Sequence, residues 1–205
     1  MVQPTAAGRR IEESAPARRD AAASRRRILD AATEEFSAHG LAGARVARIA
    51  EKATINTRMI YAYFGNKDAL FDAVLEHHVL AAQKTVTLDP TDVSGYAQQV
   101  FDAYRSQPHL VRLYLWQYLE RPGMPLAVPA AARFIHANDD VIARAQADGV
   151  VNDELPADRL LDHVLALTIG NLTCRPHQWT DEERHDVGVS VRRLTSPTTA
   201  ADPAT

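Results

Sequence analysis

Hydrophobic residues recur along most of this chain at the three- and four-residue spacing of amphipathic helices. The first such stretch, "AAASRRRILDAATEEFSAHG", follows Asp20, a suitable N-cap, and ends at Gly40, which suits the left-handed residue after a helix. One helical face collects its apolar residues, Ile28, Leu29, Ala32 and Phe36. The pattern predicts a helix over residues 20–39.

Three further helices are predicted directly downstream. Two are short and cover residues 45–53 and 57–64, with Asn56 as the N-cap of the second. Asn66 can cap a longer helix over residues 67–84. This succession of short capped segments indicates a small helical unit followed by a long connecting helix.

The rest of the chain continues in the same way. Prolines lie at or near the boundaries of the predicted segments, where a helix tolerates them. Five more helices are predicted, over residues 92–106, 108–120, 126–148, 157–173 and 181–195. No segment alternates as a strand would, so the sequence predicts an all-α fold of about nine helices. No apolar run approaches 18 residues, and no membrane span is expected.

The predicted elements divide the chain into two domains between two tails. Residues 1–19 are rich in Ala, Pro and Arg without an apolar period, and we expect a disordered basic tail there. A small N-terminal unit, 20–66, precedes a larger helical domain, 67–196, which includes the linking helix 67–84. Residues 197–205 are expected to form a second disordered end.

Charge is distributed unevenly between the two parts of the chain. The net charge is −3, yet residues 1–70 carry 12 Lys and Arg against 8 Asp and Glu, and residues 71–205 carry 11 against 18. A basic front on an acidic body suggests that the front meets a polyanion, although chance variation among solvated charges is an alternative. The single cysteine, Cys174, fits a reducing cytoplasm.

A three-residue connector joins the two short predicted helices. A connector as short as Thr54-Ile55-Asn56 makes the second helix cross the first steeply, as in a helix-turn-helix. The helix 20–39 would support the pair from behind. The outer face of the helix 57–64 would then present a set of polar and aromatic side chains, Thr57, Arg58 and Tyr61, with Tyr63 at its edge.

These side chains suit contact with double-stranded DNA. Arg58 can donate two hydrogen bonds to a guanine in the major groove. Thr57 can reach a phosphate or a thymine methyl group, and Tyr61 and Tyr63 can donate to phosphate oxygens. Lys67 lies in the first turn of a helix, where its charge opposes the helix dipole unless a phosphate is close. The arginine runs could neutralise phosphates or serve solubility alone: Arg9-Arg10, Arg18-Arg19 and Arg25-Arg26-Arg27.

The stretch "RRRILDAATEEFSAHGLAGARVARIAEKATINTRMIYAYFGNKDALFDAVLE" resembles the N-terminal domain of the TetR family of bacterial repressors. The resemblance implies an all-α homodimer with three DNA-binding helices per subunit, a linking fourth helix, and a C-terminal domain for ligand binding and dimerisation. It also implies that Lys67 contacts phosphate. By position, the residues that match the recognition helix are Thr57, Arg58, Tyr61 and Tyr63.

Two positions depart from the pattern that this family usually shows. Ala44 and Arg45 stand where a threonine often caps the second helix, and Arg45 could contact phosphate instead. Thr54 occupies the turn position where glycine is usual. Because a β-branched residue is costly at positive φ, the turn and the tilt of the following helix could differ.

The C-terminal half offers a candidate dimer surface on two helices, 157–173 and 181–195. In the first, small residues recur every four positions, at Ala166, Gly170 and Cys174, which would let another helix approach closely. Apolar stripes run beside them, through Leu160, Val164, Leu167 and Asn171 and through Val187, Val191 and Leu194. We expect a four-helix homodimer interface, with the intrachain core as the alternative use of these stripes.

A small-molecule cavity is expected near the aromatic segment "AYRSQPHLVRLYLWQYLERPG". The candidate lining residues are Tyr104, Trp116, Gln117, His136 and Asn171, although ordinary core filling is the alternative for each. The adjacent His77 and His78 point about 100° apart on a helix and cannot readily share a metal ion. The sequence predicts no metal site and no cofactor.

These observations favour a ligand-responsive, DNA-binding transcriptional regulator. We expect a repressor that leaves a palindromic operator when a small molecule binds its C-terminal domain. The alternatives are a helical small-molecule-binding module or an enzyme without DNA binding. An enzyme could use His136, Asp139 and Asp140, but no nucleophile elbow, phosphate loop or metal spacing accompanies them, and no catalytic residue is predicted.

Overall fold

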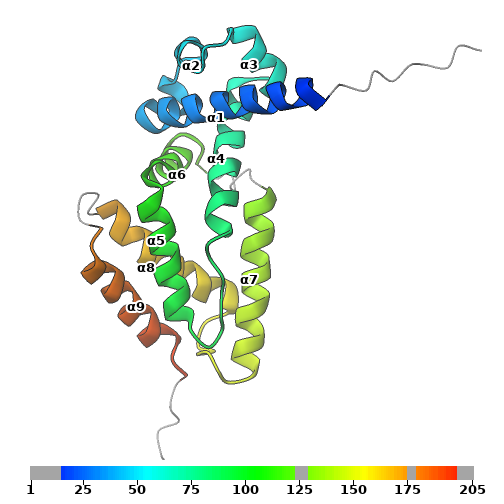
Figure 1. The fold of residues 1–205 in the computed structure, drawn as a ribbon. Coiled ribbons are helices and arrows are strands. Elements are labelled where there is room, and N and C mark those ends of the chain that lie inside the picture. Colours follow the sequence, from blue (N-terminus) through cyan, green and yellow to red (C-terminus); the bar gives the residue numbers. More distant parts are fainter. Residues whose placement is uncertain (1–14, 123–128, 175–178, 198–205) are drawn as a thin grey trace, which may run out of the picture.

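The computed structural model describes residues 15–122, 129–174 and 179–197 (Figure 1). All regular structure in these three ranges is α-helical. The helices are α1 (Ala15–Gly43), α2 (Val46–Ala53), α3 (Thr57–Phe64), α4 (Lys67–Gln83), α5 (Val93–Ser106), α6 (Pro108–Glu120), α7 (Pro129–Ala147), α8 (Ala157–Cys174) and α9 (Asp181–Thr195). In the part of the chain described, no helix is long and apolar enough to cross a membrane.

The predicted helices agree closely with the observed ones, and α6 and α9 have the predicted bounds. The largest difference is at the start of α1, which begins at Ala15, so that residues 15–19 are helical rather than part of a disordered tail. The remainder of the predicted tails, 1–14 and 198–205, lies outside the described residues.

Gly40 ends the first part of α1, as predicted. Its φ of 69° is in the left-handed region, and a separate short helical turn follows it through Gly43. A Cβ at Gly40 would lie 2.6 Å from Oε1 of Glu120 and 2.8 Å from the ring of Trp116. Glycine is therefore needed both for the backbone conformation and for the close approach of α6.

The turn between α2 and α3 keeps the conformation that glycine would have there. Thr54 has φ 56° and ψ 49°, and it is the only residue other than glycine with positive φ in the described chain. The side chain of Asn56 then accepts a hydrogen bond of 2.8 Å from the N–H of Met59, which caps α3 as predicted. Asn66 caps α4 in the same way through the N–H of Ala69.

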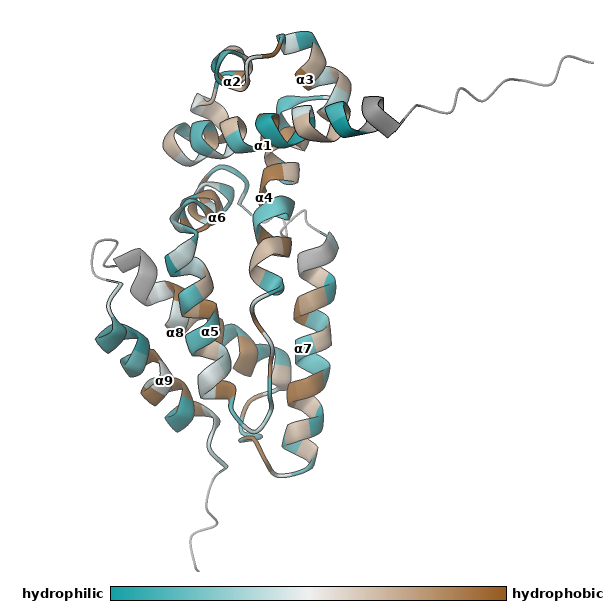
Figure 2. Cartoon of the chain, in the orientation of Figure 1, coloured by the Kyte–Doolittle hydropathy of each residue, from teal (hydrophilic) through white to brown (hydrophobic). Residues whose placement is uncertain are grey.

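The helices form two bodies joined by α4 (Figure 1). In the first, α1 supports the short helices α2 and α3, and the edge-to-face rings of Phe36 and Phe71 tie α1 to α4. In the second, α5 packs against α8 and α9, and α7 packs against α8. Hydrophobic and hydrophilic residues alternate along each helix, which gives each an apolar side for these two cores (Figure 2). Because Leu110 and Leu113 of α6 belong to the first core, α6 joins the two bodies as well.

Candidate nucleic-acid interface and internal cavity

Helix α3 exposes the side chains that were predicted to contact DNA. Ile60 is buried and anchors the inner side of the helix, whereas Arg58 is exposed. The side chains of Tyr61 and Tyr63 are 46% and 36% exposed, and Thr57 is half-buried. Among the described residues, no hydrogen bond or ion pair engages the guanidinium of Arg58. The outer face of α3 is thus a polar and aromatic surface that can reach into a DNA groove.

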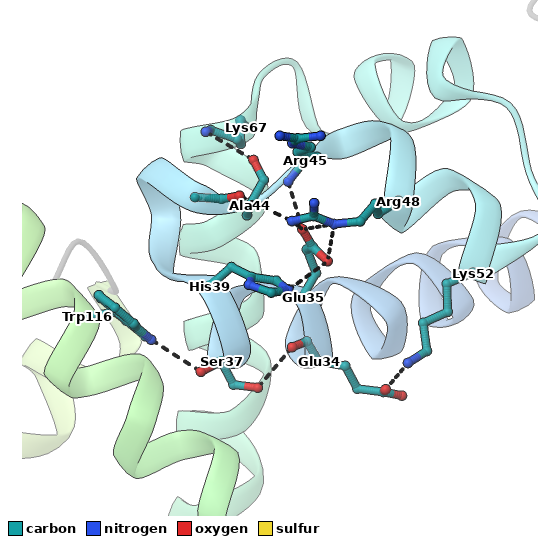
Figure 3. A network of polar contacts seen from close by, with 11 residues as sticks. Glu34, Glu35, Ser37, His39, Ala44, Arg45, Arg48, Lys52, Lys67 and Trp116 are labelled. Atoms are coloured by element: carbon teal, nitrogen blue, oxygen red, sulfur yellow. Dashed lines mark hydrogen bonds and ion pairs between the residues drawn. The ribbon is translucent and has the colours of Figure 1, made fainter.

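The N-terminus of α2 is capped by a residue of α1 instead of by its own N-cap. Arg45 makes no side-chain cap, as predicted from the missing threonine. Its backbone N–H donates instead to Oε1 of Glu35, at 2.8 Å, and its exposed side chain points away from that carboxylate (Figure 3). The guanidinium of Arg45 is therefore presented at the surface.

Glu35 also holds the side chain of Arg48 in place. Nε of Arg48 lies 2.8 Å and 3.0 Å from the two carboxylate oxygens of Glu35 (Figure 3). Partial burial acts to raise the pKa of Glu35, but the hydrogen bonds from Arg48 and from the N–H of Arg45 outweigh it and lower that pKa below its ordinary value. The sequence analysis missed Glu35, although its position one turn before His39 and Gly40 placed a carboxylate at the end of the supporting helix.

Lys67 has partners within the chain. Its Nζ lies 3.3 Å from the carbonyl oxygen of Ala42 and 3.4 Å from that of Ala44, at the end of α1. A cation is favourable there because the carbonyl groups at a helix C-terminus carry partial negative charge. Lys67 thus binds the start of α4 to residues 41–45, the α1–α2 corner. Its predicted phosphate contact stays a prediction.

One arginine of the basic run in α1 supports α3. The guanidinium of Arg25 lies 5.2 Å from the ring centroid of Phe64, a cation–π contact between the two helices. Its neighbour Arg26 is exposed. The run therefore combines a packing role with an exposed positive charge.

Helix α6 is bonded to α1 through Ser37. The carbonyl oxygen of Ser37 accepts a hydrogen bond from Nε of Arg112, at 2.7 Å. It accepts a second from the indole Nε1 of Trp116, at 3.2 Å (Figure 3). Its hydroxyl group bonds Nδ1 of His109 at 3.2 Å. These three side chains lie on one face of α6, so the DNA-binding body is attached to α6 as well as to α4.

His78 of α4 lies where α1 and the α5–α6 corner meet. Its Nε2 is 2.9 Å from Oγ1 of Thr33, and its Nδ1 is 3.1 Å from Oε1 of Gln107. The Thr33 hydroxyl also donates to the carbonyl oxygen of Leu29. Burial lowers the pKa of His78, and this effect outweighs the hydrogen bond to Gln107, which raises it; the nearby His77 and His109 lower it further.

A largely apolar cavity of about 100 Å³ lies between the helices of the C-terminal domain. It is lined by Val79, Ala82, Gln83, Val86, Tyr96, Val100, Ala103, Tyr104, Leu110, Tyr114, Phe134, Ile135 and Leu165, none of which is charged. Burial raises the pKa of Tyr96 and of Tyr114 to about 12, and that of Tyr104 well above its ordinary value, so all three phenols stay neutral. The cavity can thus surround an apolar molecule and offer it hydroxyl groups.

Of the five residues predicted to line a cavity, Tyr104 does so and three do not. Trp116 faces α1, Gln117 is buried beside Arg121, and His136 is exposed with Nδ1 3.6 Å from Oδ2 of Asp139. The helical backbone at Asn171 belongs to α8, but its side chain lies outside the described residues.

Two tyrosines of the cavity were missed by the sequence analysis. Tyr96 continues the apolar stripe of Val93 and Val100, which could have indicated an inward position. Tyr114 lies with its ring centroid 5.9 Å from that of Tyr104, although the two belong to different helices. The sequence contains no signal for that pairing.

Part of the predicted dimer surface serves the core of the chain itself. Leu160 and Val164 of α8 and Val187 and Val191 of α9 are buried within the single chain, as the alternative interpretation held. A shallow groove on the outside of these two helices remains, lined by His163, Ala166, Leu167 and Leu194. Ala166, Leu167 and Leu194 belong to the predicted dimer surface, and the dimer stays a prediction.

Comparison with known protein families gives a match for each half of the chain. The family model described as "Bacterial regulatory proteins, tetR family" matches residues 28–74, and "Tetracyclin repressor-like, C-terminal domain" matches residues 92–199.

The chain is 39% identical over 152 residues to the HTH-type transcriptional repressor SCO4008 of Streptomyces coelicolor, covering 74% of this chain and 79% of that protein. It is 34% identical over 105 residues to the HTH-type transcriptional repressor NicS of Pseudomonas putida, covering 48% of this chain and 50% of that one. The crystal structure of the Streptomyces coelicolor regulator SCO4942 superposes with a TM-score of 0.74 at 30% identity, over 85% of this chain and 99% of that chain.

The structure agrees with these matches. Helix α3 exposes one face of a three-helix unit, α4 links this unit to the rest, and the C-terminal domain is helical. The protein is a DNA-binding transcriptional regulator. The chain belongs to the TetR family of bacterial regulatory proteins.

Proposed function

We propose that this protein represses transcription by binding a palindromic operator as a homodimer, and that a small molecule in the C-terminal cavity releases it. The observation that carries the DNA-binding part is the arrangement of α3, where Ile60 is buried and Arg58 points to solvent with Tyr61 and Tyr63. Arg58 would read a guanine, while the tyrosines would bind phosphates. Two relatives named as repressors support the sign of regulation.

Positive side chains around the α1–α2 corner would fix the protein on the phosphate backbone. Arg45 presents an exposed guanidinium there, and Lys67, with three donors, keeps capacity for a phosphate beside its two carbonyl partners. The N-terminus of α4 adds partial positive charge at the same place.

A homodimer would bring two copies of α3 to successive major grooves, roughly 34–36 Å apart. We propose that α8 and α9 form its interface, because the groove of His163, Ala166, Leu167 and Leu194 exposes apolar surface across both helices. As a regulator of bacterial genes, the dimer would act in the cytoplasm.

The effector would be a largely apolar molecule without a negative charge. Among the described residues, no basic side chain lines the cavity to neutralise a carboxylate or phosphate, and the tyrosine hydroxyls offer hydrogen bonds to neutral groups. Because Leu110 and Tyr114 line the cavity while His109, Arg112 and Trp116 hold α1, a displacement of α6 would alter the seating of the DNA-binding body. Coupling of about 1–3 kcal/mol would change operator affinity by roughly 5- to 150-fold.

Selection of bound fragments from genomic DNA, followed by titration at several salt concentrations, tests this function. We expect recovery of fragments with an inverted repeat, bound by two subunits and preferred over random duplex of the same length by at least ~10³-fold. Recovery of random fragments only, or equal affinity for both duplexes, would show that the chain does not recognise an operator.

A further inference from the structure

The last turn of α6 reaches the α1–α2 corner through Glu120. Oε2 of Glu120 accepts hydrogen bonds from the backbone N–H groups of Leu41, at 2.5 Å, and Ala42, at 3.1 Å. These two residues begin the short helical turn that follows the interruption at Gly40. The first N–H groups of a helical turn have no partner inside the helix and attract negative charge, so a carboxylate suits this position.

Three carbonyl groups and one more N–H of this corner are also held by side chains from different helices. The carbonyl oxygens of Ala42 and Ala44 accept from Lys67 of α4, and that of Gly43 accepts from Arg48 of α2 at 3.2 Å. Figure 3 shows this convergence beside Glu35, whose carboxylate receives the N–H of Arg45. Glu120 and Lys67 come from α6 and α4, the two helices of this group that also line the cavity, α6 through Leu110 and Tyr114.

The contact between α6 and the corner is close. A Cβ at position 40 would collide with the side chains of both Glu120 and Trp116, so the backbone of the corner rests directly against these two side chains of α6. The chain separation between Glu120 and Leu41 is 79 residues, which makes this a tertiary link rather than a local cap. The link bypasses α4, which connects the same two bodies through the chain itself.

We propose that Glu120 is a positioning residue that orients the α1–α2 corner, and with it Arg45 and the helix-turn-helix, for binding to the operator. The carboxylate holds the turn 41–43 at a fixed place on α6, and the corner in turn fixes the first residue of α2. This inference rests on the proposed function, because the quantity that Glu120 controls is the affinity for a specific duplex.

The experiment compares E120Q and E120D with E34Q in the full-length dimer. E120Q keeps the size of the side chain and removes its charge, and E120D keeps the charge and shortens the reach. Glu34 is the matched control, since it also lies at the α1–α2 contact, where it pairs with Lys52, and it is about half exposed. Loss of one negative charge near DNA raises the affinity for any duplex, and E34Q measures that general effect.

Two readouts separate positioning from electrostatics. In amide hydrogen exchange on the protein without DNA, we expect the N–H groups of Leu41 and Ala42 to exchange about tenfold faster in both Glu120 variants, and at the wild-type rate in E34Q. In titrations with the selected operator and with random duplex, we expect both Glu120 variants to lose roughly 5- to 10-fold in operator affinity. Affinity for random duplex should stay at the wild-type value or above.

The proposal fails if E120Q strengthens binding to both duplexes as E34Q does, or if the exchange of Leu41 and Ala42 is unchanged. It also fails if E120D and E120Q lose affinity for both duplexes equally, since that would indicate general unfolding of the domain. If the wild-type protein shows no operator preference, the proposed function fails instead, and the exchange measurement still decides whether Glu120 holds the corner.

Discussion

Nη1 of Arg121 lies 2.6 Å from Oδ1 of Asp72, so the end of α6 is ion-paired to the first half of α4. Nη2 of the same guanidinium lies 3.0 Å from Oδ1 of Asp68, and the group stacks 5.1 Å from the ring centroid of Phe71. Arg121 is almost fully buried, with 8% of its side chain exposed. Glu120, the last residue of α6, therefore holds the α1–α2 corner, and Arg121, the C-cap that follows it, holds α4.

Substitution of Arg121 by alanine should destabilise the protein by about 2 kcal/mol, because Asp72 would lose its charged hydrogen-bond partner in a half-buried position. Urea unfolding followed by circular dichroism measures this change. Asp68→Asn should cost clearly less, since the side chain of Asp68 is 66% exposed and its pair with Arg121 is screened by solvent. Equal losses for the two variants would contradict the assignment of the main contact to Asp72.

Substitution of Arg58 by alanine should weaken operator binding by about 1–3 kcal/mol and relax the preference at one base position. The reason is that Arg58 is exposed on the outer face of α3 and is suited to a bidentate contact with guanine. Gel-shift titrations with operator and with single-base variants would measure both effects. Arg26→Ala is the control, because this exposed residue of α1 can contribute only general charge. A uniform loss on specific and random DNA for Arg58→Ala would exclude base reading.

Substitution of Lys67 by alanine should lower the affinity for every duplex and reduce the salt dependence by about one phosphate contact. It should also lower the thermal stability, because the ammonium group binds the carbonyl groups of Ala42 and Ala44. Lys84→Ala at the far end of α4 provides a control that removes the same charge away from the interface. Unchanged salt dependence together with reduced stability would show that Lys67 stabilises the α1–α2 corner but does not contact phosphate.

The helix-turn-helix could be predicted from the sequence because its signals are local. Asn56 and Asn66 act as caps within three residues, and the apolar period places Ile60 inward and Arg58 outward. The long-range tethers could not be predicted in this way. Glu35 and Glu120 bind backbone N–H groups of the corner that are 10 and 79 residues away in the sequence. No local pattern in the sequence predicts these partners.

The cavity was harder to predict for a related reason. Tyr114 and Trp116 are two residues apart on α6, yet one lines the cavity and the other bonds the backbone of α1. Both side chains are aromatic and therefore suited to burial. Whether each one lines the cavity or contacts α1 depends on how the other helices pack around α6, which the sequence pattern does not show. The same holds for Leu160 and Val187, whose apolar stripes fit an intrachain core and a dimer interface equally well in the sequence.

Replacement of Thr54 by glycine should stabilise the protein by about 1 kcal/mol, because a β-branched residue at φ 56° carries strain that glycine lacks. Thermal or urea unfolding measures the gain. The turn already has the left-handed conformation, so operator affinity should stay the same. Thr54→Ala is a useful comparison, since alanine keeps a Cβ in the left-handed region and should give little gain. A loss of operator affinity in Thr54→Gly would show that the threonine side chain contributes to binding.

Acidification should destabilise the protein through His78. Burial lowers its pKa most, and the neighbouring His77 and His109 act in the same direction. The hydrogen bond to Gln107 and the charge of Asp30 raise the pKa but do not outweigh burial, so the folded state resists protonation. The unfolded chain takes up its proton near the ordinary pKa of about 6.5, and the stability contributed by the neutral ring is lost as the pH falls through the lower pKa of the folded state. The melting temperature, measured between about pH 8 and pH 5, should therefore fall, and the fall should be smaller in His78→Gln. His77→Gln, which changes the exposed neighbour, should keep most of the wild-type fall in melting temperature. If the melting temperature of His78→Gln depended on pH as in the wild type, His78 would not be the group responsible for the acid destabilisation.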